Sequence, residues 1–90
     1  MSQAARWRVE TTASFDRDFR KLDRTMQKRV LAYLLDVAEL DDPRQRGKGL
    51  TGNHTGQWRY RVGDYRVLAV IDDNALIVLA LNVGNRSGIY

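Results

Sequence analysis

The chain has 90 residues, no cysteine and a formal net charge of +4 at pH 7. This length allows one domain with a single hydrophobic core, and the lack of cysteine excludes disulfide bonds and thiolate metal sites. The longest apolar run, around residues 75–81, is far shorter than the roughly 20 residues of a membrane-spanning helix, and the first residues lack the apolar core of a signal peptide. We therefore expect one soluble, cytoplasmic domain spanning residues 1–90.

The positive charge is concentrated in the second half of the chain. Residues 1–42 hold eight basic and eight acidic residues, whereas residues 43–90 hold seven basic and three acidic residues. No acidic residue occurs between Pro43 and Gly63, a window that contains Arg44, Arg46, Lys48, Arg59 and Arg61. Such a local field indicates a nucleic acid or another polyanion as partner, or an acidic protein that covers the basic surface.

The first predicted elements are a strand and a short helix. Residues 6–11 alternate in polarity, with Trp7 and Val9 on one side, which predicts a strand. Thr12 or Ser14 can cap the helix that follows. The apolar stripe of this helix consists of Phe15, Phe19 and Leu22.

A longer helix is predicted from Arg24 to about Leu40, with Asp23 as its N-cap. Its end is marked by Pro43, because proline disfavours helical geometry in the residue before it. We expect the two helices to form an αα-hairpin that packs on a sheet. The longer helix should present a wide apolar face made of Met26, Val30, Leu34 and Val37, flanked by Leu31, Leu35 and Ala38.

The segment 44–56 is predicted to be a basic, mobile loop, because it is rich in glycine and has little periodicity. Three strands follow, at residues 57–62, 65–72 and 75–83, joined by turns at 63–64 and 73–74. They should form an antiparallel meander, with the last two strands central because both of their faces are apolar. The predicted fold class is α+β, with the helices packed on one four-stranded sheet.

The strand 57–62 and its turn place arginines close together. With Gly63 as the first residue of a two-residue type II′ turn, Arg61 lies opposite Arg66, and Arg59 lies on the same face. Like charges across a strand pair destabilise it, so the arginines either form a solvated rim or bind an anion, and we favour a phosphate. The other face of the strand carries Trp58, Tyr60 and Val62. These side chains are expected to pack under the helices, the alternative for Trp58 and Tyr60 being to stack on bases.

The candidate chemistry is that of arginine, lysine and tyrosine. The single histidine, His54, lies in the glycine-rich segment and is expected to be a solvated loop residue. No spacing resembles a metal site or an activated nucleophile. RNA cleavage suits the remaining residues, because the ribose 2′-hydroxyl is its own nucleophile, and the protein must only position the RNA, neutralise the phosphorane and move protons. A tyrosine among cations has its phenolate form stabilised, which lowers its pKa.

The order of elements and several short motifs together resemble the RelE/ParE superfamily of toxin–antitoxin toxins, specifically its RelE-like branch. The resemblance covers nearly the whole chain, from the first strand through the two helices to the meander. Its most specific motifs are Leu50-Thr51-Gly52, the stretch from Trp58 to Leu68, Ile71-Asp72-Asp73, Val83-Gly84-Asn85-Arg86 and Ile89-Tyr90.

The resemblance implies the toxin of a type II toxin–antitoxin system. Such a toxin is an mRNA interferase: a ribosome-dependent, metal-independent endoribonuclease without cofactors. It enters the ribosomal A site, next to 16S rRNA, and cleaves the mRNA by attack of a 2′-hydroxyl on the adjacent phosphate, which inhibits translation and growth. A cognate antitoxin neutralises the toxin, and the complex binds operator DNA through the antitoxin.

The resemblance also implies roles for five residues. Arg59 and Arg61 would bind the substrate backbone and stabilise the transition state, and Arg66 would contact the scissile phosphate. Arg86 would assist the leaving oxygen, and Tyr90 would activate the 2′-hydroxyl. The family often has lysine at the first two positions; because a guanidinium hardly gives up a proton, we expect electrostatic stabilisation from Arg59 and Arg61.

We further expect the basic window to bind RNA through Arg44, Arg46, Lys48, Arg59 and Arg61. The main alternative is a ParE-like toxin that shares the fold, lacks nuclease activity and inhibits DNA gyrase. A third interpretation is a degenerate toxin that is kept only to regulate its operon together with the antitoxin.

Overall fold

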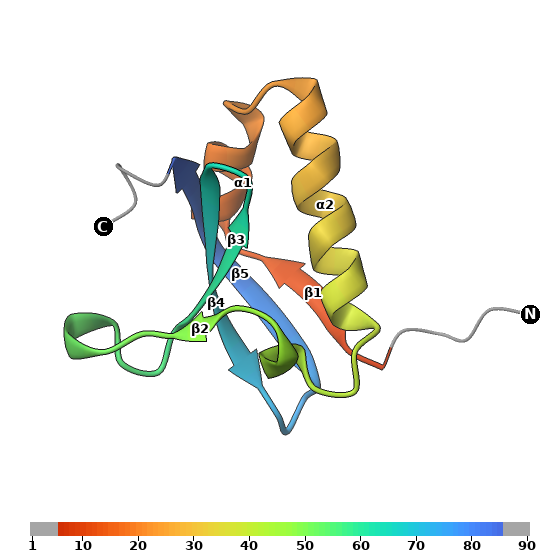
Figure 1. Cartoon of the computed structure of the whole chain (residues 1–90), viewed down its shortest axis with the longest axis vertical. Coiled ribbons are helices and arrows are strands. Elements are labelled where there is room, and N and C mark those ends of the chain that lie inside the picture. Colours follow the sequence, from red (N-terminus) through yellow and green to blue (C-terminus); the bar gives the residue numbers. More distant parts are fainter. Residues whose placement is uncertain (1–5, 86–90) are drawn as a thin grey trace, which may run out of the picture.

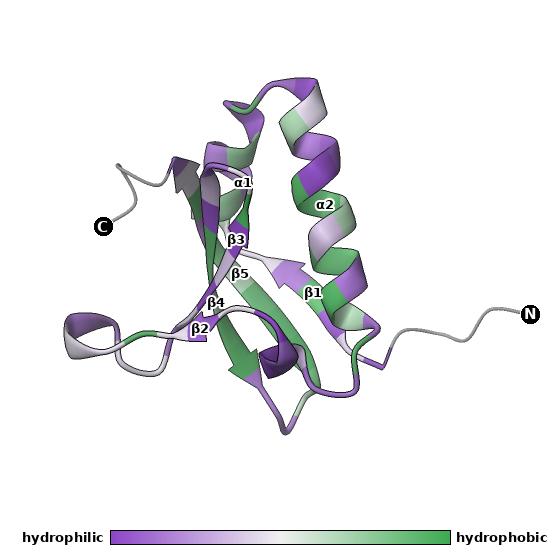
Figure 2. Cartoon of the chain, in the orientation of Figure 1, coloured by the Kyte–Doolittle hydropathy of each residue, from purple (hydrophilic) through white to green (hydrophobic). Residues whose placement is uncertain are grey.

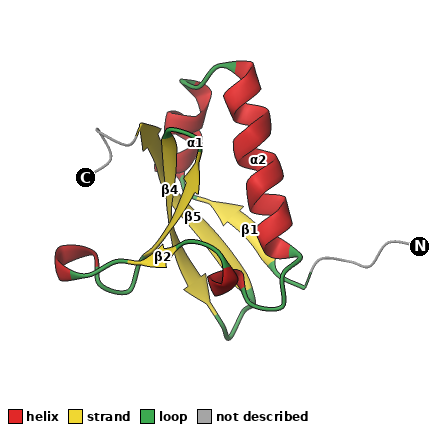
Figure 3. Cartoon of the chain, in the orientation of Figure 1, coloured by secondary structure: helices red, strands yellow, loops and turns green. Residues whose placement is uncertain are grey.

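The computed structural model describes residues 6–85. Its helices are α1 and α2, and its strands are β1 to β5 (Figures 1 and 3). Their bounds are β1 Arg8–Thr11, α1 Ala13–Arg20, α2 Arg24–Ala38, β2 Lys48–Gly49, β3 Trp58–Val62, β4 Tyr65–Asp72 and β5 Ile77–Asn85, with two short 3₁₀ helices at Pro43–Gln45 and Gly52–His54. Within residues 6–85, no helix is long and apolar enough to cross a membrane.

The strands form one sheet in the order β1-β5-β4-β3-β2. β1 pairs with β5 in parallel, and the other neighbours are antiparallel. The predicted α+β fold, with an αα-hairpin on a sheet and a central β4–β5 pair, is confirmed. The sheet has five strands instead of four, because Lys48–Gly49 pairs with the start of β3. Two residues are too few for polarity alternation to reveal a strand in the sequence.

Side-chain caps begin both helices. The hydroxyl of Thr12 accepts a hydrogen bond from the backbone N–H of Phe15 (3.0 Å), and the carboxylate of Asp23 accepts one from the N–H of Met26 (2.8 Å). Of the two caps considered for α1, the structure therefore uses Thr12. The Thr12 hydroxyl also donates to the carbonyl of Leu81 (2.7 Å), next to an irregularity in the pairing of β4 and β5. The cap thus ties the start of α1 to the sheet.

The core lies between the two helices and one face of the sheet. The helices contribute Phe15, Val30, Leu34 and Val37, and the sheet contributes Tyr60, Val62, Val67, Val78 and Ala80. Figure 2 shows hydrophobic residues along β5 and along part of α2, whereas much of the remaining helix surface is hydrophilic. In β3, successive side chains point to opposite faces of the sheet. Tyr60 and Val62 face the core, so the residues between them face away from the helices.

The apolar face of α2 is narrower than the sequence predicts. Leu31 and Leu35 remain 47% and 61% exposed. Each follows a residue of the buried row, Val30 and Leu34, by one position, which rotates it about 100° around the helix axis. The wide face expected for α2 was therefore wrong on this side, whereas Ala38 on the same flank is buried.

The segment 44–56, predicted to be a basic, mobile loop, contains short regular elements that the sequence did not predict. It contains β2 and the 3₁₀ helix Gly52–His54, and the preceding 3₁₀ helix extends into it as far as Gln45. The buried hydroxyl of Tyr60 donates to the carbonyl of Pro43 (2.7 Å), and the indole N–H of Trp58 donates to the carbonyl of Arg46 (2.7 Å). Long-range contacts of this kind order a glycine-rich segment that has no periodicity of its own.

The last turn is longer than predicted. Residues 73–76 connect the strands, and β5 begins at Ile77 and extends to Asn85. The carboxylate of Asp72 accepts hydrogen bonds from the N–H groups of Asn74 (3.0 Å) and Ala75 (3.1 Å). This Asx turn removes residues 75 and 76 from the strand predicted over 75–83.

Candidate functional site

The register of β3 and β4 places three arginines on one face of the sheet. Arg61 pairs with Arg66, and Arg59 pairs with Leu68. Gly63 has φ of 60°, as the first residue of a type II′ turn requires. Since Tyr60 and Val62 point into the core, these arginines lie on the opposite face of the strand. We call this face, which points away from α1 and α2, the distal face.

Strand β2 adds a fourth cation to this group. Lys48 pairs with Arg59 in the antiparallel register of β2 and β3, and paired residues point to the same face of a sheet. The structure thus brings together Lys48, Arg59, Arg61 and Arg66, which we call the distal-face cations. Lys48 was expected to bind RNA from a loop, and the sequence carried no signal for this strand pairing.

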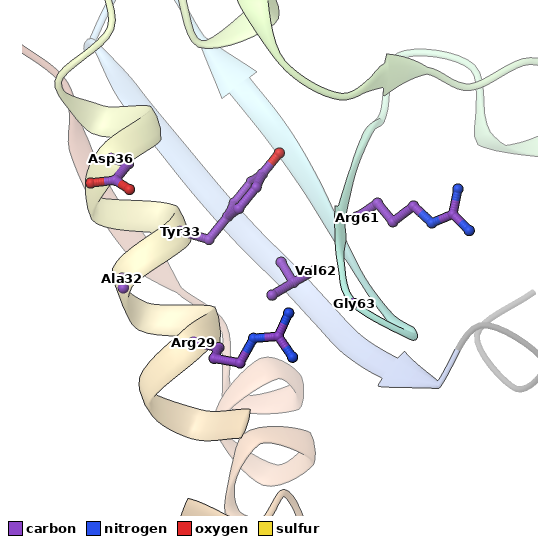
Figure 4. Close-up of a pocket in the computed structure, with 7 residues that line it drawn as sticks. All are labelled: Arg29, Ala32, Tyr33, Asp36, Arg61, Val62 and Gly63. Carbon is purple, nitrogen blue, oxygen red and sulfur yellow. The ribbon is translucent and has the colours of Figure 1, made fainter. Parts of the chain in front are cut away.

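The distal-face cations differ in exposure. Lys48 and Arg61 are exposed, whereas Arg59 and Arg66 are half-buried. In the part of the chain that the structure describes, neither Lys48 nor Arg61 forms an ion pair with a carboxylate. Figure 4 shows the guanidinium of Arg61 pointing away from α2. The positive charges of Lys48 and Arg61 are therefore available to an anion from outside the protein.

The other two basic residues of the predicted RNA-binding segment point elsewhere. Arg44 binds Asp73 (2.7 Å) and Asp42 (3.3 Å), and its hydrogen bonds hold the pKa of the Asp73 carboxyl below its ordinary value. Arg46 stacks over the ring of Tyr33 on α2, 5.6 Å from its centroid. The structure does not bring either residue into the distal-face group.

Two tyrosines at the core, the buried Tyr60 and the half-buried Tyr33, have raised pKa values. Burial raises the pKa of Tyr60 well above its ordinary value, and nearby Tyr33 raises it further. Burial also raises the pKa of Tyr33, although Arg46 partly opposes this shift. The lowered pKa expected of a tyrosine among cations is therefore found at neither residue, and Tyr90, the predicted catalytic tyrosine, lies outside the described residues together with Arg86.

The described chain offers little for metal chemistry. No cluster of three or more His, Cys, Asp or Glu side chains suited to a metal occurs within residues 6–85. His54 is half-buried, and its Nδ1 lies 3.3 Å from Oε1 of Gln57. The expectation of a solvated loop histidine is therefore only partly met.

A groove of about 370 Å³ lies between α2 and the end of the β3–β4 hairpin (Figure 4). Arg29 reaches from α2 towards the turn, where a Cβ built on Gly63 would lie 3.2 Å from its Nη2. Sequence reasoning missed this cation, because Arg29 belongs to a segment without net charge. The groove is lined by Arg29, Ala32, Tyr33, Asp36, Arg61, Val62 and Gly63.

The chain is similar in sequence and in fold to known proteins. Residues 9–90 match the family described as the ParE toxin of the type II toxin–antitoxin system parDE. The chain is 30% identical to Toxin RelE of Mycobacterium tuberculosis over 90 residues, which is all of this chain and 92% of that protein.

Solved structures are similar over almost the full length. The toxin–antitoxin complex RelBE2 of M. tuberculosis has a chain that is 28% identical, with a TM-score of 0.83 over 97% of this chain and 99% of that one. In the archaeal RelE–RelB complex of Pyrococcus horikoshii the identity is 23% and the TM-score 0.74, over 94% of this chain and 99% of that one.

Proposed function

The chain belongs to the RelE/ParE superfamily of type II toxin–antitoxin toxins, and from this premise we propose that it is a ribosome-dependent endoribonuclease that cleaves mRNA in the A site. The observation that carries the proposal is the group of distal-face cations on adjoining strands. The 30% identity to a toxin named RelE supports the nuclease branch of the superfamily.

The proposed reaction needs no metal. The 2′-hydroxyl loses its proton, its oxygen forms a bond to the adjacent phosphorus, and the bond from phosphorus to the 5′-oxygen breaks. The departing 5′-oxygen gains a proton, so that the products are a 2′,3′-cyclic phosphate and a free 5′-hydroxyl, with no net change in protons. Negative charge accumulates on the phosphorane oxygens. Guanidinium groups match such oxygens in shape and charge, and stabilising this charge is the main contribution that the protein must make.

The proposed roles are those implied by the family resemblance, and for Lys48, Arg59, Arg61 and Arg66 they agree with the places of these residues on the distal face. Arg66 contacts the scissile phosphate, and Arg61, directly opposite it, stabilises the same transition state. Arg59 and Lys48, further along the strand pair, bind the RNA backbone. For Arg86 and Tyr90, which lie outside the described residues, the resemblance alone supplies the roles: Arg86 assists the leaving 5′-oxygen, and Tyr90 accepts the proton of the 2′-hydroxyl.

We leave Arg44 and Arg46 out of the RNA contacts. Arg44 would have to leave two carboxylates, and Arg46 lies over Tyr33 on the helix side of the sheet. Both residues anchor the segment that carries Lys48. Their positive charge still adds to the long-range field that attracts RNA.

The proposed protein partner is a cognate antitoxin. Similar chains were solved as RelB–RelE complexes with their antitoxins. An acidic or amphipathic segment of the antitoxin would cover the distal-face cations and keep RNA away, and the antitoxin would supply the contacts to operator DNA. The location of such a system is the cytoplasm, where ribosomes and operator are found.

Inhibition of DNA gyrase is the second candidate function. It is favoured by the family description, which names the ParE toxin. A gyrase inhibitor has no need for a row of cations arranged around a phosphate, so the distal face argues for the nuclease. Inhibition in a supercoiling assay at a small excess of toxin over gyrase would reverse this order.

The experiment that tests the proposal is in-vitro translation of a defined mRNA with the purified toxin. Cut sites are mapped by primer extension, with and without ribosomes, for the wild type and for Arg86→Ala. We expect cuts within A-site codons that disappear without ribosomes and in the variant. No cut in either condition, from a chain that still arrests growth, would overturn the nuclease and favour gyrase.

A further inference from the structure

The side chain of Trp58 holds the short strand β2 in place. Its indole N–H donates to the carbonyl of Arg46 (2.7 Å), just before β2, and the backbone N–H of Leu50 donates to the carbonyl of Gln57 (3.0 Å), just after it. A ladder of two residues is too short to be stable alone. The indole therefore supplies an anchor that the backbone of β2 lacks.

Two glycines make room for the indole. A Cβ on Gly47 would lie 2.4 Å from the carbonyl oxygen of Arg59 and 2.5 Å from Nε1 of Trp58, and φ at this glycine is 82°. A Cβ on Gly49 would lie 3.1 Å from Cζ3 of the same ring. The indole thus lies directly against the backbone on both sides of Lys48, and Gly47 cannot be replaced without moving the strand.

The consequence for Lys48 follows from the pleat of the sheet. Gly49 pairs with Trp58, and Lys48 pairs with Arg59, so the indole and the lysine side chain lie on opposite faces. A contact made on the helix side of the sheet thereby fixes a cation on the distal face. Without it, Lys48 would belong to a flexible segment and would lose more conformational freedom when it binds.

We propose that Trp58 is a positioning residue for RNA binding, which holds Lys48 beside Arg59 so that the two cations bind the RNA phosphate backbone together. The inference rests on the proposed function and deepens it. It assigns Lys48 to binding of the RNA rather than to the chemical step, because Lys48 pairs with Arg59 and lies away from the Arg61–Arg66 pair. Trp58 touches neither RNA nor the reacting atoms.

The experiment is a double-mutant cycle with Trp58→Phe, Lys48→Ala and the combined variant. Trp58→Phe keeps an aromatic ring but removes the N–H donor. Single-turnover cleavage on ribosomes programmed with a defined mRNA gives the maximal rate and the toxin concentration for half-maximal rate. Lys28→Ala is the matched control, since it removes an exposed lysine of α2.

We expect either single substitution to raise the half-saturating concentration by about five-fold, the size of one hydrogen bond or phosphate contact. The maximal rate should stay within about two-fold, since the chemical step is untouched. The combined variant should be no worse than Lys48→Ala alone, because Trp58 acts through Lys48. Multiplied effects, or a lower maximal rate at unchanged half-saturation, would overturn the inference.

A second variant tests the inference if Trp58→Phe fails to fold. Two further measurements test it if the wild type does not cleave RNA in the assay. Gly49→Ala places a Cβ 3.1 Å from Cζ3 of Trp58, so the indole has to shift by a few tenths of an ångström, while the indole N–H donor is kept. Amide exchange at Leu50 and binding of a single-stranded RNA oligonucleotide, followed by fluorescence anisotropy, need no cleavage. Faster exchange together with weaker RNA binding is expected, and unchanged values of either would overturn the inference. A wild type that binds RNA through Lys48 but does not cleave would contradict the proposed function alone.

Discussion

The two faces of the β3–β4 hairpin differ in what their side chains contribute to stability. On the helix side, Tyr60 and Val62 are buried in the core, and every polar group there has to find a partner, as the Tyr60 hydroxyl does at Pro43. On the distal face, Arg61 lies directly opposite Arg66, an arrangement that weakens the strand pair. The side chains on one face of β3 therefore stabilise the fold, whereas an arginine on the other face destabilises the strand pair locally.

This difference teaches where the chain tolerates unfavourable contacts. Like charges that face each other are kept in proteins when they bind something of opposite charge, and residues of this kind mark functional sites. Substitutions on the helix side should therefore change stability first, and substitutions on the distal face should change activity first.

The largest effect is expected from Tyr60→Ala. Removing a fully buried aromatic ring leaves a cavity, and the Pro43 carbonyl loses its donor, so the free energy of unfolding should fall by about 4 kcal/mol. Tyr60→Phe keeps the ring and should cost only about 1 kcal/mol. Urea unfolding followed by tryptophan fluorescence measures both. Equal losses for the two variants would show that the hydroxyl, rather than the ring, supports the core.

Arg66→Ala should have the largest effect on activity. We expect the cleavage rate to fall by a factor on the order of 10²–10³, because a guanidinium at the scissile phosphate is lost, and Arg86→Ala should behave similarly. Ribosome binding should be largely kept. The single-turnover rate at saturating toxin checks this, with Lys28→Ala as control. A loss of ribosome binding as large as the loss of rate would make Arg66 a residue that positions the substrate.

Arg61→Gln should change stability and cleavage activity in opposite directions. It relieves the repulsion from Arg66, so the fold should become more stable by a few tenths of a kcal/mol, while cleavage slows. The gain in stability should shrink at high salt, which screens the charges. Thermal unfolding at low and high ionic strength measures this effect. A destabilised variant would mean that the two guanidinium groups stabilise the hairpin.

The smallest effect is expected from Asp73→Asn, which removes the exposed partner of Arg44. Hydrogen bonds from Arg44 lower the pKa of the folded Asp73 carboxyl. Its contribution to stability is thus complete above the ordinary carboxyl pKa of about 4 and is lost as the pH falls through the lower folded value. The wild type should melt slightly above the variant at neutral pH, and the difference should vanish once the pH is well below the lowered folded pKa. A difference that persists there would not come from this ion pair.

Local patterns predicted most of the elements and part of the site. The register of the β3–β4 hairpin follows from the glycine of its two-residue turn and from the alternation of Trp58, Tyr60 and Val62, so the amino-acid sequence alone groups Arg59, Arg61 and Arg66 on one face. Caps such as Asp23 marked the start of α2. The exposure of Leu35 could not be predicted in the same way, because it depends on how far the sheet extends beneath the helix.

The sequence by itself determined the features that depend on residues close together in the chain. These are the strand alternation, the helix caps and the tight turn at Gly63. The tertiary structure alone decided the parallel pairing of β1 with β5, the existence of β2 and the directions of the basic side chains around it. Arg44 turns to Asp73, Arg46 to Tyr33 and Lys48 to the distal face. The partners that direct Arg44, Arg46 and Lys48 lie on α2, β3 and the β4–β5 turn, and only the folded chain brings these elements together.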